Sequence, residues 1–358
     1  MGNSLQIGLV GPLPPPSGGM ANQTLQLAKL LREEKVQVDV VQTNVAYKPI
    51  WIGKIPVIRA FFRLFFYIIK LWSVAGRVDL FHIMANSGWS WHLFTVPAVW
   101  IAKLRGVPTV INYRGGEAEK FFSKSFKYVK PTLNASSKII VPSLFLEKVF
   151  SKRGITTQII ANIIDLDRFN ARKEQQEKYL PHLLVARNLE LIYDNETAIR
   201  AFKEILDSYP NAKLTIAGTG PERDNLKSLV QELGIAKQVK FTGRVDTQEM
   251  PALYQSADVM LNPSRVDNMP NSILEALASG VPVVSTNVGG IPYMVEHEKT
   301  ALLVDPEDPV AMASEICRVL EDKRCQQQLV SSGLILVKQF SWSEVSRHWL
   351  SLYKMLAA

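Results

Sequence analysis

Residues 262–290, NPSRVDNMPNSILEALASGVPVVSTNVGG, decide the fold of this chain. After a short polar loop, a helix is predicted to begin near Asn271 or Ser272, because both residue types are common N-caps. Gly280 is predicted to stop that helix. The apolar run that follows, residues 281–285, is typical of a buried parallel strand. The stretch therefore predicts a loop–helix–strand unit of an α/β protein.

The start of this helix offers a place for a diphosphate. The first N–H groups of a helix lack partners within the helix and lie at the positive end of its dipole. Glu275 would repel phosphates at that point, so we expect its carboxylate to reach past them to hydroxyl groups. Asp267 precedes it by eight residues. This stretch thus combines a helix start that suits phosphate with a carboxylate for a ribose and a second carboxylate. The combination predicts a nucleotide-sugar site.

The same stretch resembles the E-x7-E signature of the family 4 retaining glycosyltransferases, which have the GT-B fold. Asp267 and Glu275 occupy the two acidic positions, and residues 275–284 resemble the EA-x-A-x-G-x-PVV block that follows in the family. The resemblance implies that Asp267 touches the transferred sugar and that Glu275 binds the ribose. The simpler alternative is an ordinary α/β helix whose first turns are charged.

Length and charge bound the architecture. A chain of 358 residues with 47% apolar content predicts two domains with full cores. Residues 1–165 contain 20 Lys/Arg and 8 Asp/Glu (+12), and residues 166–358 contain 21 and 25 (−4), which together give the net charge of +8. The basic half favours an anionic membrane surface or an anionic acceptor. No nucleic-acid-binding motif is visible, so we expect no nucleic-acid partner.

The beginning of the chain and the two cysteines favour a cytoplasmic protein. The apolar segment 7–10 follows residues without a basic cluster, so it predicts a first core strand and not a signal peptide. Cys317 and Cys325 have no metal-site companions in the sequence, which favours reduced thiols. We expect a cytoplasmic protein that binds the inner face of the plasma membrane peripherally.

A glycine pair follows the first predicted strand. Gly18 and Gly19 lie in a loop before a helix predicted over residues 22–32. Glycines let the backbone approach a ligand closely. The resemblance implies that this loop touches the donor phosphate, although a plain strand-to-helix turn would look the same.

The segment 60–72 is almost entirely aromatic and branched, and it is broken by Arg63 and Lys70. It is too short to span a bilayer, which needs about 20 apolar residues. Two interpretations stay open. One is an interfacial helix whose basic residues, with Arg59, lie at the headgroups. The other is a core helix whose basic side chains extend to the surface.

Further residues of the first half resemble the family's acceptor side. They are His82, Asn86, Arg114, Gly115 and Glu117. We interpret His82 as a hydrogen-bonded core histidine in preference to a catalyst. Many family members have a histidine where Arg114 lies. Arginine cannot act as a base at physiological pH but can hold a phosphate or an acidic sugar.

In the second half, Arg187 matches the family's diphosphate-binding arginine. The lysine expected five residues later is absent, because Ile192 or, with one inserted residue, Tyr193 occupies that place. Losing one of two cations would weaken leaving-group stabilisation unless another arginine, Arg114 or Arg265, substitutes. The remaining donor-side positions implied by the resemblance are Gly218, Arg244, Val245, Asn271 and Ser272.

The strand–helix alternation predicts a GT-B fold, with two Rossmann-like, doubly wound parallel-sheet domains facing a central cleft. We expect an acceptor-binding domain over residues 1–165, with a last helix, 342–358, that packs back on it. A nucleotide-sugar domain is expected over residues 166–341.

The predicted activity is that of a retaining, hexosyltransferase-type glycosyltransferase. It would move a sugar from a UDP- or GDP-sugar to a glycan or lipid-linked acceptor in polysaccharide or glycoconjugate biosynthesis, with Asp267, Arg187 and Arg114 as catalytic candidates. No cofactor or metal is expected. The alternatives are a GT-B sugar-nucleotide epimerase and a non-catalytic partner of an active transferase.

Overall fold

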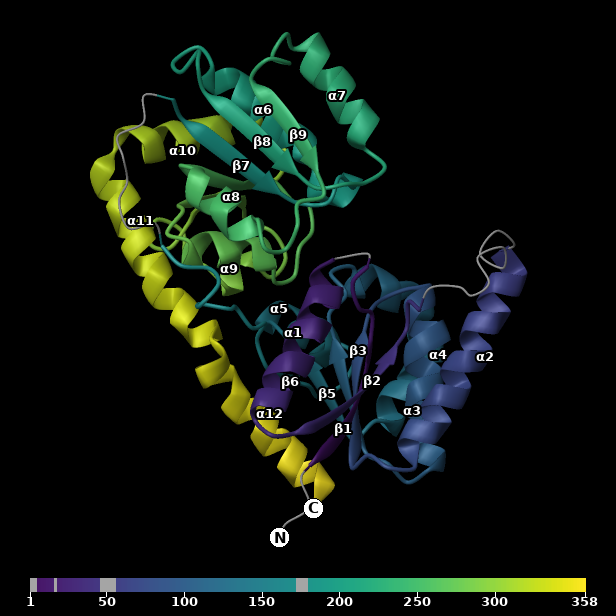
Figure 1. The fold of residues 1–358 in the computed structure, drawn as a ribbon. Coiled ribbons are helices and arrows are strands. Elements are labelled where there is room, and N and C mark those ends of the chain that lie inside the picture. Colours follow the sequence, from purple (N-terminus) through teal and green to yellow (C-terminus); the bar gives the residue numbers. More distant parts are fainter. Residues whose placement is uncertain (1–4, 16–17, 46–55, 172–179) are drawn as a thin grey trace. The chain divides into compact units, whose positions relative to one another are not determined.

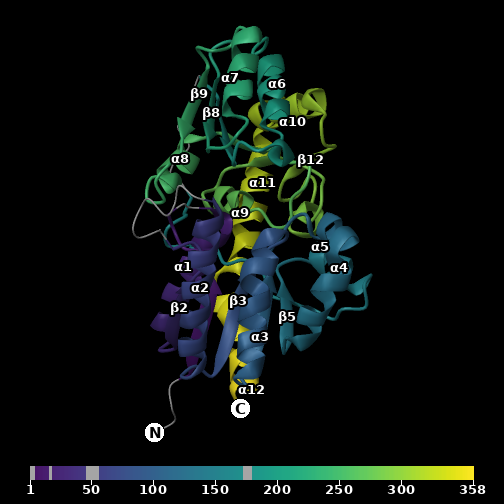
Figure 2. The ribbon, with the colours of Figure 1, turned by 90° about the vertical axis from the view of Figure 1, so that its right-hand side faces the viewer.

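The chain forms two compact units in the computed structural model, which describes residues 5–15, 18–45, 56–171 and 180–358. The side chains of residues 56–62 also lie outside the described part, and with them the predicted role of Arg59. Unit 1 comprises the chain up to Ile163 together with Val345–Ala358, and unit 2 comprises Ile164–Glu344. Each unit has its own sheet with helices on both faces, as predicted for Rossmann-like domains (Figures 1 and 2).

The sheet of unit 1 has six parallel strands in the order β2-β1-β3-β4-β5-β6. The strands are β1 (Gln6–Gly11), β2 (Gln37–Gln42), β3 (Leu80–Ala85), β4 (Thr109–Tyr113), β5 (Lys138–Val141) and β6 (Gln158–Ile159). The central strands are apolar and buried because helices cover both faces. The strand order reverses between β1 and β3, so the loops after these two strands begin side by side.

Helices cover both faces of the unit 1 sheet. They are α1 (Gly19–Glu33), α2 (Pro56–Ala75), the π-helix η2 (Trp91–Thr95), α3 (Val96–Leu104), α4 (Ala118–Ala135), α5 (Leu144–Ser151) and, from Val345 on, α12 (Trp342–Ala357). Figure 1 shows α2, α3 and α4 on one face and α1 with α12 on the other. α1 begins at Gly19, three residues earlier than predicted, so the glycine pair forms the start of the helix itself.

The sheet of unit 2 also has six parallel strands, in the order β12-β11-β10-β7-β8-β9. The strands are β7 (His182–Ala186), β8 (Lys213–Ala217), β9 (Val239–Gly243), β10 (Val259–Asn262), β11 (Val283–Thr286) and β12 (Leu302–Val304). This is the strand order of a dinucleotide-type Rossmann sheet, whose switch point lies between its first and fourth strands, here β7 and β10.

The helices of unit 2 form two layers. They are η3 (Leu191–Tyr193), α6 (Asn195–Ile205), α7 (Arg223–Glu232), α8 (Met250–Ser256), α9 (Asn271–Ala278), η4 (Ile291–Tyr293), α10 (Pro309–Glu321), α11 (Lys323–Leu336) and η5 (Val337–Phe340). α6 packs on α7 and α10 over one face of the sheet, and α9 packs with α8 and α11 over the other (Figure 1).

The helix of the deciding stretch, α9, begins at Asn271 as predicted but without the predicted side-chain cap. Pro270 is the N-cap residue, with an extended backbone (φ −67°, ψ 117°), and no side chain caps the helix. The expected capping by Asn271 or Ser272 is therefore wrong, because both lie inside the first turn. The end is as predicted: α9 stops at Ala278, and Gly280 follows with φ +69°.

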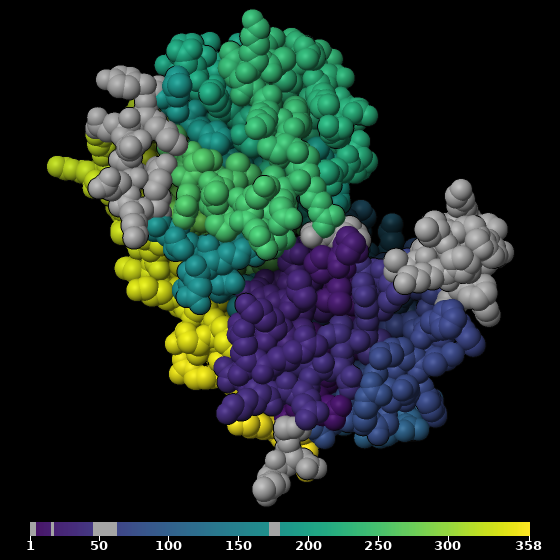
Figure 3. Space-filling view, in the orientation of Figure 1, coloured from purple at the N-terminus to yellow at the C-terminus, as the bar shows by residue number. Residues whose placement is uncertain are grey.

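α2 has two apolar faces, so neither interpretation of this segment describes it alone. Tyr67, Leu71 and Val74 are buried in the core of unit 1, and the Nε of Arg63 is buried as well. The opposite face is exposed and apolar. Its members are Phe65, Phe66, Ile68, Ile69 and Trp72. The atoms of this part of the chain, drawn in blue-violet, reach the surface in Figure 3.

Candidate functional site

Arg187 and Asp267, predicted to bind the diphosphate and the sugar, lie together at the switch point of unit 2. Arg187 directly follows β7, and Asp267 lies in the loop after β10, which pairs with β7. The Nη2 of Arg187 donates a hydrogen bond to Oδ2 of Asp267. Only 11% and 12% of the two side chains are exposed. Spacing alone did not predict this ion pair, which joins two of the three catalytic candidates.

The carboxylate of Asp267 is held from several directions. Its Oδ1 accepts the N–H of Asn268 at 2.9 Å, and its Oδ2 also accepts the hydroxyl of Ser264 at 3.3 Å. Burial raises the pKa of Asp267, while the charge of Arg187 acts in the opposite direction. Both oxygens are thus engaged, which fixes the orientation of the carboxylate.

An aromatic ring packs against Arg187. Tyr193, one of the two residues suggested for the position of the missing lysine, lies with its ring 4.0 Å from the Cζ of Arg187. Such stacking adds no charge for a phosphate, but it fixes the plane of the guanidinium. The Nε of Arg187 is buried and has no hydrogen-bond partner among the described residues. This atom is a donor that a ligand could satisfy. Arg265, the other suggested substitute, instead pairs with Asp194 and Glu307.

Two glycines allow the backbone to approach the loops that carry these residues. A Cβ at Gly218 would lie 2.0 Å from the carbonyl oxygen of Arg187, and a Cβ at Gly290 would lie 1.7 Å from that of Asn268. Both distances exclude any side chain. The N–H of Gly290 donates to the carbonyl of Asp267 at 2.9 Å. Gly218 therefore supports the site through backbone packing.

The second acid, Glu275, lies in α9 and has a buried partner. The hydroxyl of Tyr254, in α8, donates to Oε2 of Glu275 at 2.9 Å. Burial raises the pKa of Glu275 to about 7, against the effects of Tyr254, Arg168 and Arg187. Asn271 and Ser272 are the first two residues of α9, and the hydroxyl of Ser272 is buried without a hydrogen-bond partner among the described residues.

Arg244 and Val245 lie after β9, at the edge of the sheet and two strands away from β7. Arg244 is exposed and Val245 is half-buried. Because β8 lies between β7 and β9, the structure places Arg244 and Val245 apart from the Arg187–Asp267 pair.

The predicted acceptor-side residues gather after β3 and β4 of unit 1. Asn86 follows β3, and its Oδ1 accepts the N–H of Ser87 at 2.8 Å. A Cβ at Gly115 would lie 2.4 Å from the Oγ of Ser87, so the two loops are in close contact. Glu117 is the N-cap residue of α4 and pairs with Lys120 at 2.9 Å.

Arg114 directly follows β4, and its side chain contacts α1 and the segment just before Ile163. Its Nη2 donates to Oδ1 of Asn162 and, at 3.4 Å, to Oε1 of Gln23 in α1. Burial lowers the pKa of Arg114 to about 10, so the group stays charged at neutral pH. Gly18 is the N-cap residue of α1, and Gly19 begins its first turn. Both follow β1, which is one of the two strands at the β1/β3 switch point.

His82 is a core histidine, as interpreted from the sequence. It is fully buried in β3. Its Nδ1 lies 2.6 Å from the hydroxyl of Tyr353 in α12, and its Nε2 lies 3.1 Å from the Nδ2 of Asn112. Burial lowers its pKa to about 3. Since the ring has no exposed surface, the assignment of His82 to the acceptor side is wrong.

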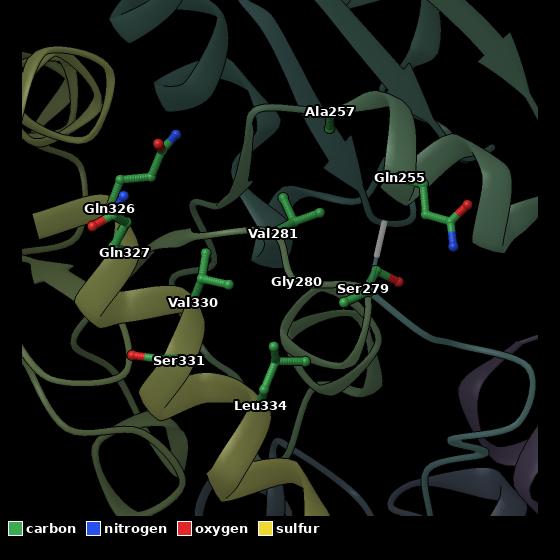
Figure 4. A pocket seen from close by; sticks show the side chains of 11 residues that line it. Gln255, Ala257, Ser279, Gly280, Val281, Gln326, Gln327, Val330, Ser331 and Leu334 are labelled. Carbon is green, nitrogen blue, oxygen red and sulfur yellow. The ribbon is translucent and has the colours of Figure 1, made fainter. Parts of the chain in front are cut away.

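A pocket of about 240 Å³ lies elsewhere in unit 2, between α11 and the end of α9 (Figure 4). Its lining includes Gln255, Ser279, Gly280, Val330 and Leu334, and all of its lining residues are uncharged. A diphosphate needs cations or free N–H groups. The chemistry therefore favours the switch point as the nucleotide site.

Two further observations concern metals and membranes. Among the described residues, no three or more His, Cys, Asp or Glu side chains are grouped so that they could hold a metal ion. In the same part of the chain, no helix has the length and apolar character needed to cross a membrane.

Comparison with protein families identifies the chain. Residues 167–333 match the family described as glycosyl transferases group 1, and residues 17–168 match the one described as glycosyltransferase family 4. The chain belongs to the group 1 glycosyltransferases. The predicted family is thereby confirmed, as is the GT-B fold class with two Rossmann-like parallel-sheet domains.

Curated relatives of this group 1 glycosyltransferase match over about half their length. An uncharacterized glycosyltransferase of Methanocaldococcus jannaschii is 37% identical over 45% of this chain and 41% of its own. A Mycobacterium tuberculosis protein is 34% identical over 54% of this chain and 53% of its own. Its name is GDP-mannose-dependent alpha-(1-6)-phosphatidylinositol monomannoside mannosyltransferase.

Solved structures share the fold of this group 1 glycosyltransferase over nearly the whole chain. Sucrose-phosphate synthase from Thermosynechococcus elongatus has a TM-score of 0.77 at 21% identity and covers 98% of this chain and 99% of its own. Anabaena HepE, solved in complex with UDP, has a TM-score of 0.76 at 18% identity and covers 98% and 100%.

Proposed function

We propose that this chain transfers a sugar from a nucleoside-diphosphate sugar to an acceptor hydroxyl with retention of configuration. The observation that carries the proposal is the buried Arg187–Asp267 pair at the β7/β10 switch point. In open α/β sheets, ligands bind outside the carboxyl ends of the strands at that point.

Stabilising the leaving diphosphate is the main chemical task. Arg187 would supply a fixed positive charge, and the first N–H groups of α9 would add hydrogen bonds and the positive end of the helix dipole. This arrangement requires no metal, because cationic and N–H donors take up the charge.

The environment of Asp267 supports retention by attack on the same face of the sugar. A carboxylate buried in an ion pair with an arginine is a weak nucleophile, because the cation and the hydrogen bonds stabilise its negative charge. Both oxygens of Asp267 already accept hydrogen bonds, and Oδ2 is paired with Arg187. We therefore assign Asp267 to holding the transferred sugar, and Glu275 to the ribose hydroxyls.

The donor is proposed to be a UDP- or GDP-sugar. HepE was solved with UDP and with UDP-glucose, and the M. tuberculosis relative is named for GDP-mannose. Arg114, Asn86, Gly115 and Glu117 are assigned to the acceptor half in unit 1, where the charge of Arg114 suits an anionic group.

The acceptor is proposed to be a lipid-linked or membrane-proximal glycan. The exposed face of α2 supports this, since Phe65, Phe66 and Trp72 are 49%, 61% and 48% exposed. Two cations lie over neighbouring rings: Arg105 is 5.0 Å from the ring of Trp72, and Lys103 is 5.3 Å from that of Trp100. Aromatic rings beside basic groups are typical of the interface between lipid headgroups and acyl chains.

The charge of the first half of the chain also favours anionic lipid. Residues 1–165 contain 20 Lys/Arg and 8 Asp/Glu. A basic patch attracts the anionic cytoplasmic leaflet by about 1 kcal/mol per charge near the surface. A cytoplasmic protein bound peripherally to the inner face of the plasma membrane fits these features, and polysaccharide or glycoconjugate biosynthesis is the corresponding process.

The decisive test is donor binding followed by product stereochemistry. UDP-, GDP- and ADP-sugars are screened for protection against thermal unfolding, where a ligand at 100 times its Kd stabilises by about 2.7 kcal/mol. With the donor identified, slow hydrolysis in the absence of acceptor is followed by proton NMR. We expect the released sugar to appear first with the donor's own anomeric configuration. An inverted anomer would contradict the retaining mechanism.

One alternative has a specific observation in its favour. The absence of the family's lysine at Ile192 or Tyr193 would fit a non-catalytic partner of an active transferase. That protein would bind the nucleotide sugar without releasing nucleoside diphosphate, so the same NMR experiment separates the two. An epimerase would instead convert the donor to its epimer, but it leaves the exposed face of α2 without a role.

A further inference from the structure

Tyr254 is a buried tyrosine whose hydroxyl faces the proposed nucleotide site. Its side chain is fully buried in α8, and its ring packs edge-on against Phe169 at 5.9 Å. The hydroxyl donates to Oε2 of Glu275 at 2.9 Å. Burial and the nearby charge of Glu275 raise the pKa of Tyr254 well above its usual value. The hydroxyl therefore stays protonated at neutral pH and remains a donor.

The hydrogen bond from Tyr254 engages only one oxygen of the Glu275 carboxylate, Oε2. Among the described residues, Oε1 of Glu275 has no hydrogen-bond partner. An ionised carboxylate has about four acceptor positions on its two oxygens, whereas the protonated form gives one of them up to become a donor. A pair of adjacent hydroxyl groups needs two acceptor positions, so the ionised form suits that ligand best.

Glu275 is balanced between its two protonation states. Burial acts against the charged form and raises its pKa to about 7. Three groups favour the charged form: the hydroxyl of Tyr254 from α8, Arg168 from the segment after Ile164, and Arg187 from the end of β7. Removing any of them would therefore shift the balance towards the neutral acid.

We propose that Tyr254 is a positioning residue for donor binding: its hydroxyl orients Glu275 and holds it ionised, with Oε1 presented to a vicinal diol of the nucleotide sugar. This inference rests on the proposed assignment of Glu275 to the ribose. It adds a residue from another helix that no feature of the deciding stretch indicates, because Tyr254 lies 21 residues before its partner.

The test is Tyr254→Phe, which removes the hydroxyl and keeps the ring that packs on Phe169. Binding of UDP-glucose and GDP-mannose is measured by calorimetry between pH 5.5 and 8.5, because their diphosphate diesters do not titrate in that range. For the wild-type protein, we expect the affinity for the binding donor to rise with pH through about 7 and then to level off. In Tyr254→Phe the midpoint should move upward by about half a pH unit or more, with an affinity at high pH within about threefold of wild type.

Two variants serve as controls. Glu275→Gln should bind more weakly and lose the pH dependence. Tyr209→Phe also removes a hydroxyl bonded to a glutamate, Glu321 at 3.2 Å, but at the surface. It should follow the wild-type profile. Superimposable profiles for Tyr254→Phe and wild type, with a flattened profile for Glu275→Gln, would overturn the proposal.

A measurement without ligand separates this inference from the proposed function. If Glu275→Gln binds donor like wild type, or no donor binds, the ribose assignment fails. The Glu275 carboxyl is then titrated by carbon-13 NMR in both proteins. A higher midpoint in Tyr254→Phe supports the effect of the hydroxyl on Glu275, and equal midpoints overturn it.

Discussion

Arg187 is fixed by two different partners before any ligand arrives. The carboxylate of Asp267 holds one edge of the guanidinium, and the ring of Tyr193 covers its face at 4.0 Å. The buried Nε has no partner among the described residues. A single arginine oriented in this way would act on the leaving diphosphate without the family's second cation, because a preorganised charge needs no reorganisation during the reaction.

Replacing Arg187 with Ala is expected to lower kcat by more than tenfold, which corresponds to about 1.4 kcal/mol or more of transition-state stabilisation. The measurement is the rate at which nucleoside diphosphate is released from the donor. Arg200→Ala is the matched control, because Arg200 pairs with Glu196 on the exposed surface of α6. Wild-type turnover in Arg187→Ala would make this arginine structural and would strengthen the non-catalytic alternative.

Replacing Glu275 with Ala is expected to weaken donor binding by roughly 2–3 kcal/mol, as loss of charge-assisted hydrogen bonds does. The comparison is made by calorimetry at pH 8, above the pKa of about 7 at which the wild-type carboxyl ionises. Glu232→Ala, at the exposed end of α7 in the same unit, is the control. Equal affinities for Glu275→Ala and wild type would remove Glu275 from the site.

Residue types and spacing predicted Asp267, Glu275 and Arg187 but not their partners. The E-x7-E spacing fixes two acids on one segment, whereas Tyr193 and Tyr254 reach the site from other elements. No local pattern predicts the contacts of these tyrosines, because the contacts depend on how separate elements pack. His82 was interpreted correctly as a core residue, since a histidine inside an apolar strand is more easily buried than exposed.

At the scale of elements, α9 shows where sequence rules lose precision. Asn and Ser are favoured caps, yet the helix starts after Pro270 without any side-chain cap. Packing explains this: Ile273, Leu274 and Leu277 are buried against the rest of unit 2. Burial of such an apolar face contributes more than a single cap, about 1 kcal/mol. The existence and the start of the helix were therefore predictable, and its capping was not.

The exposed face of α2 leads to a prediction about membranes. The double variant Phe65→Ser, Phe66→Ser should bind vesicles of anionic phospholipid at least tenfold more weakly than wild type, since both rings are about half exposed or more. Vesicle sedimentation measures this, at low and at physiological salt. Wild-type binding should weaken with salt, because screening acts within about 8–10 Å at that strength. Phe62, in the same segment 60–72, lies outside the residues whose side chains are described.

Matched controls come from exposed apolar residues on other helices. Leu25→Ser in α1 and Ile335→Ser in α11 remove side chains that are 50% and 65% exposed. They should bind vesicles like wild type. Circular dichroism checks that the double variant remains folded. If the wild-type protein does not bind anionic vesicles at low salt, the result would indicate a soluble acceptor.

At the scale of the whole molecule, one buried group in each unit responds to acid in the opposite direction from the other. In unit 1, the pKa of His82 is lowered to about 3 from an unfolded value of 6.5. The unfolded chain therefore takes up this proton first, and stability falls as the pH drops below 6.5. In unit 2, the pKa of Glu275 is raised to about 7 from 4.5. The folded form binds that proton first, so stability rises as the pH drops through 7.

Scanning calorimetry at pH 7.5 and pH 5.5 is expected to show these opposite shifts. Each group changes the free energy of unfolding by about 1–2 kcal/mol over this range. For units of this size, such a change shifts Tm by roughly 2–8 °C. The transition of unit 1 should move down and that of unit 2 up. Glu275→Gln should abolish the upward shift, and two transitions that move together in wild type would contradict the prediction.

The membership of Val345–Ala358 in unit 1 has a consequence for the order in which the protein folds during synthesis. Between Ile163 and Val345 the ribosome must make the 181 residues of Ile164–Glu344. At about 5–20 residues per second, this takes roughly 10–40 s. During that time His82 lacks the hydroxyl of Tyr353, and its ring lacks the neighbouring ring of Trp349. We therefore expect unit 2, although its synthesis begins second, to complete its structure first. Unit 1 can complete its structure only when Val345–Ala358 have been made.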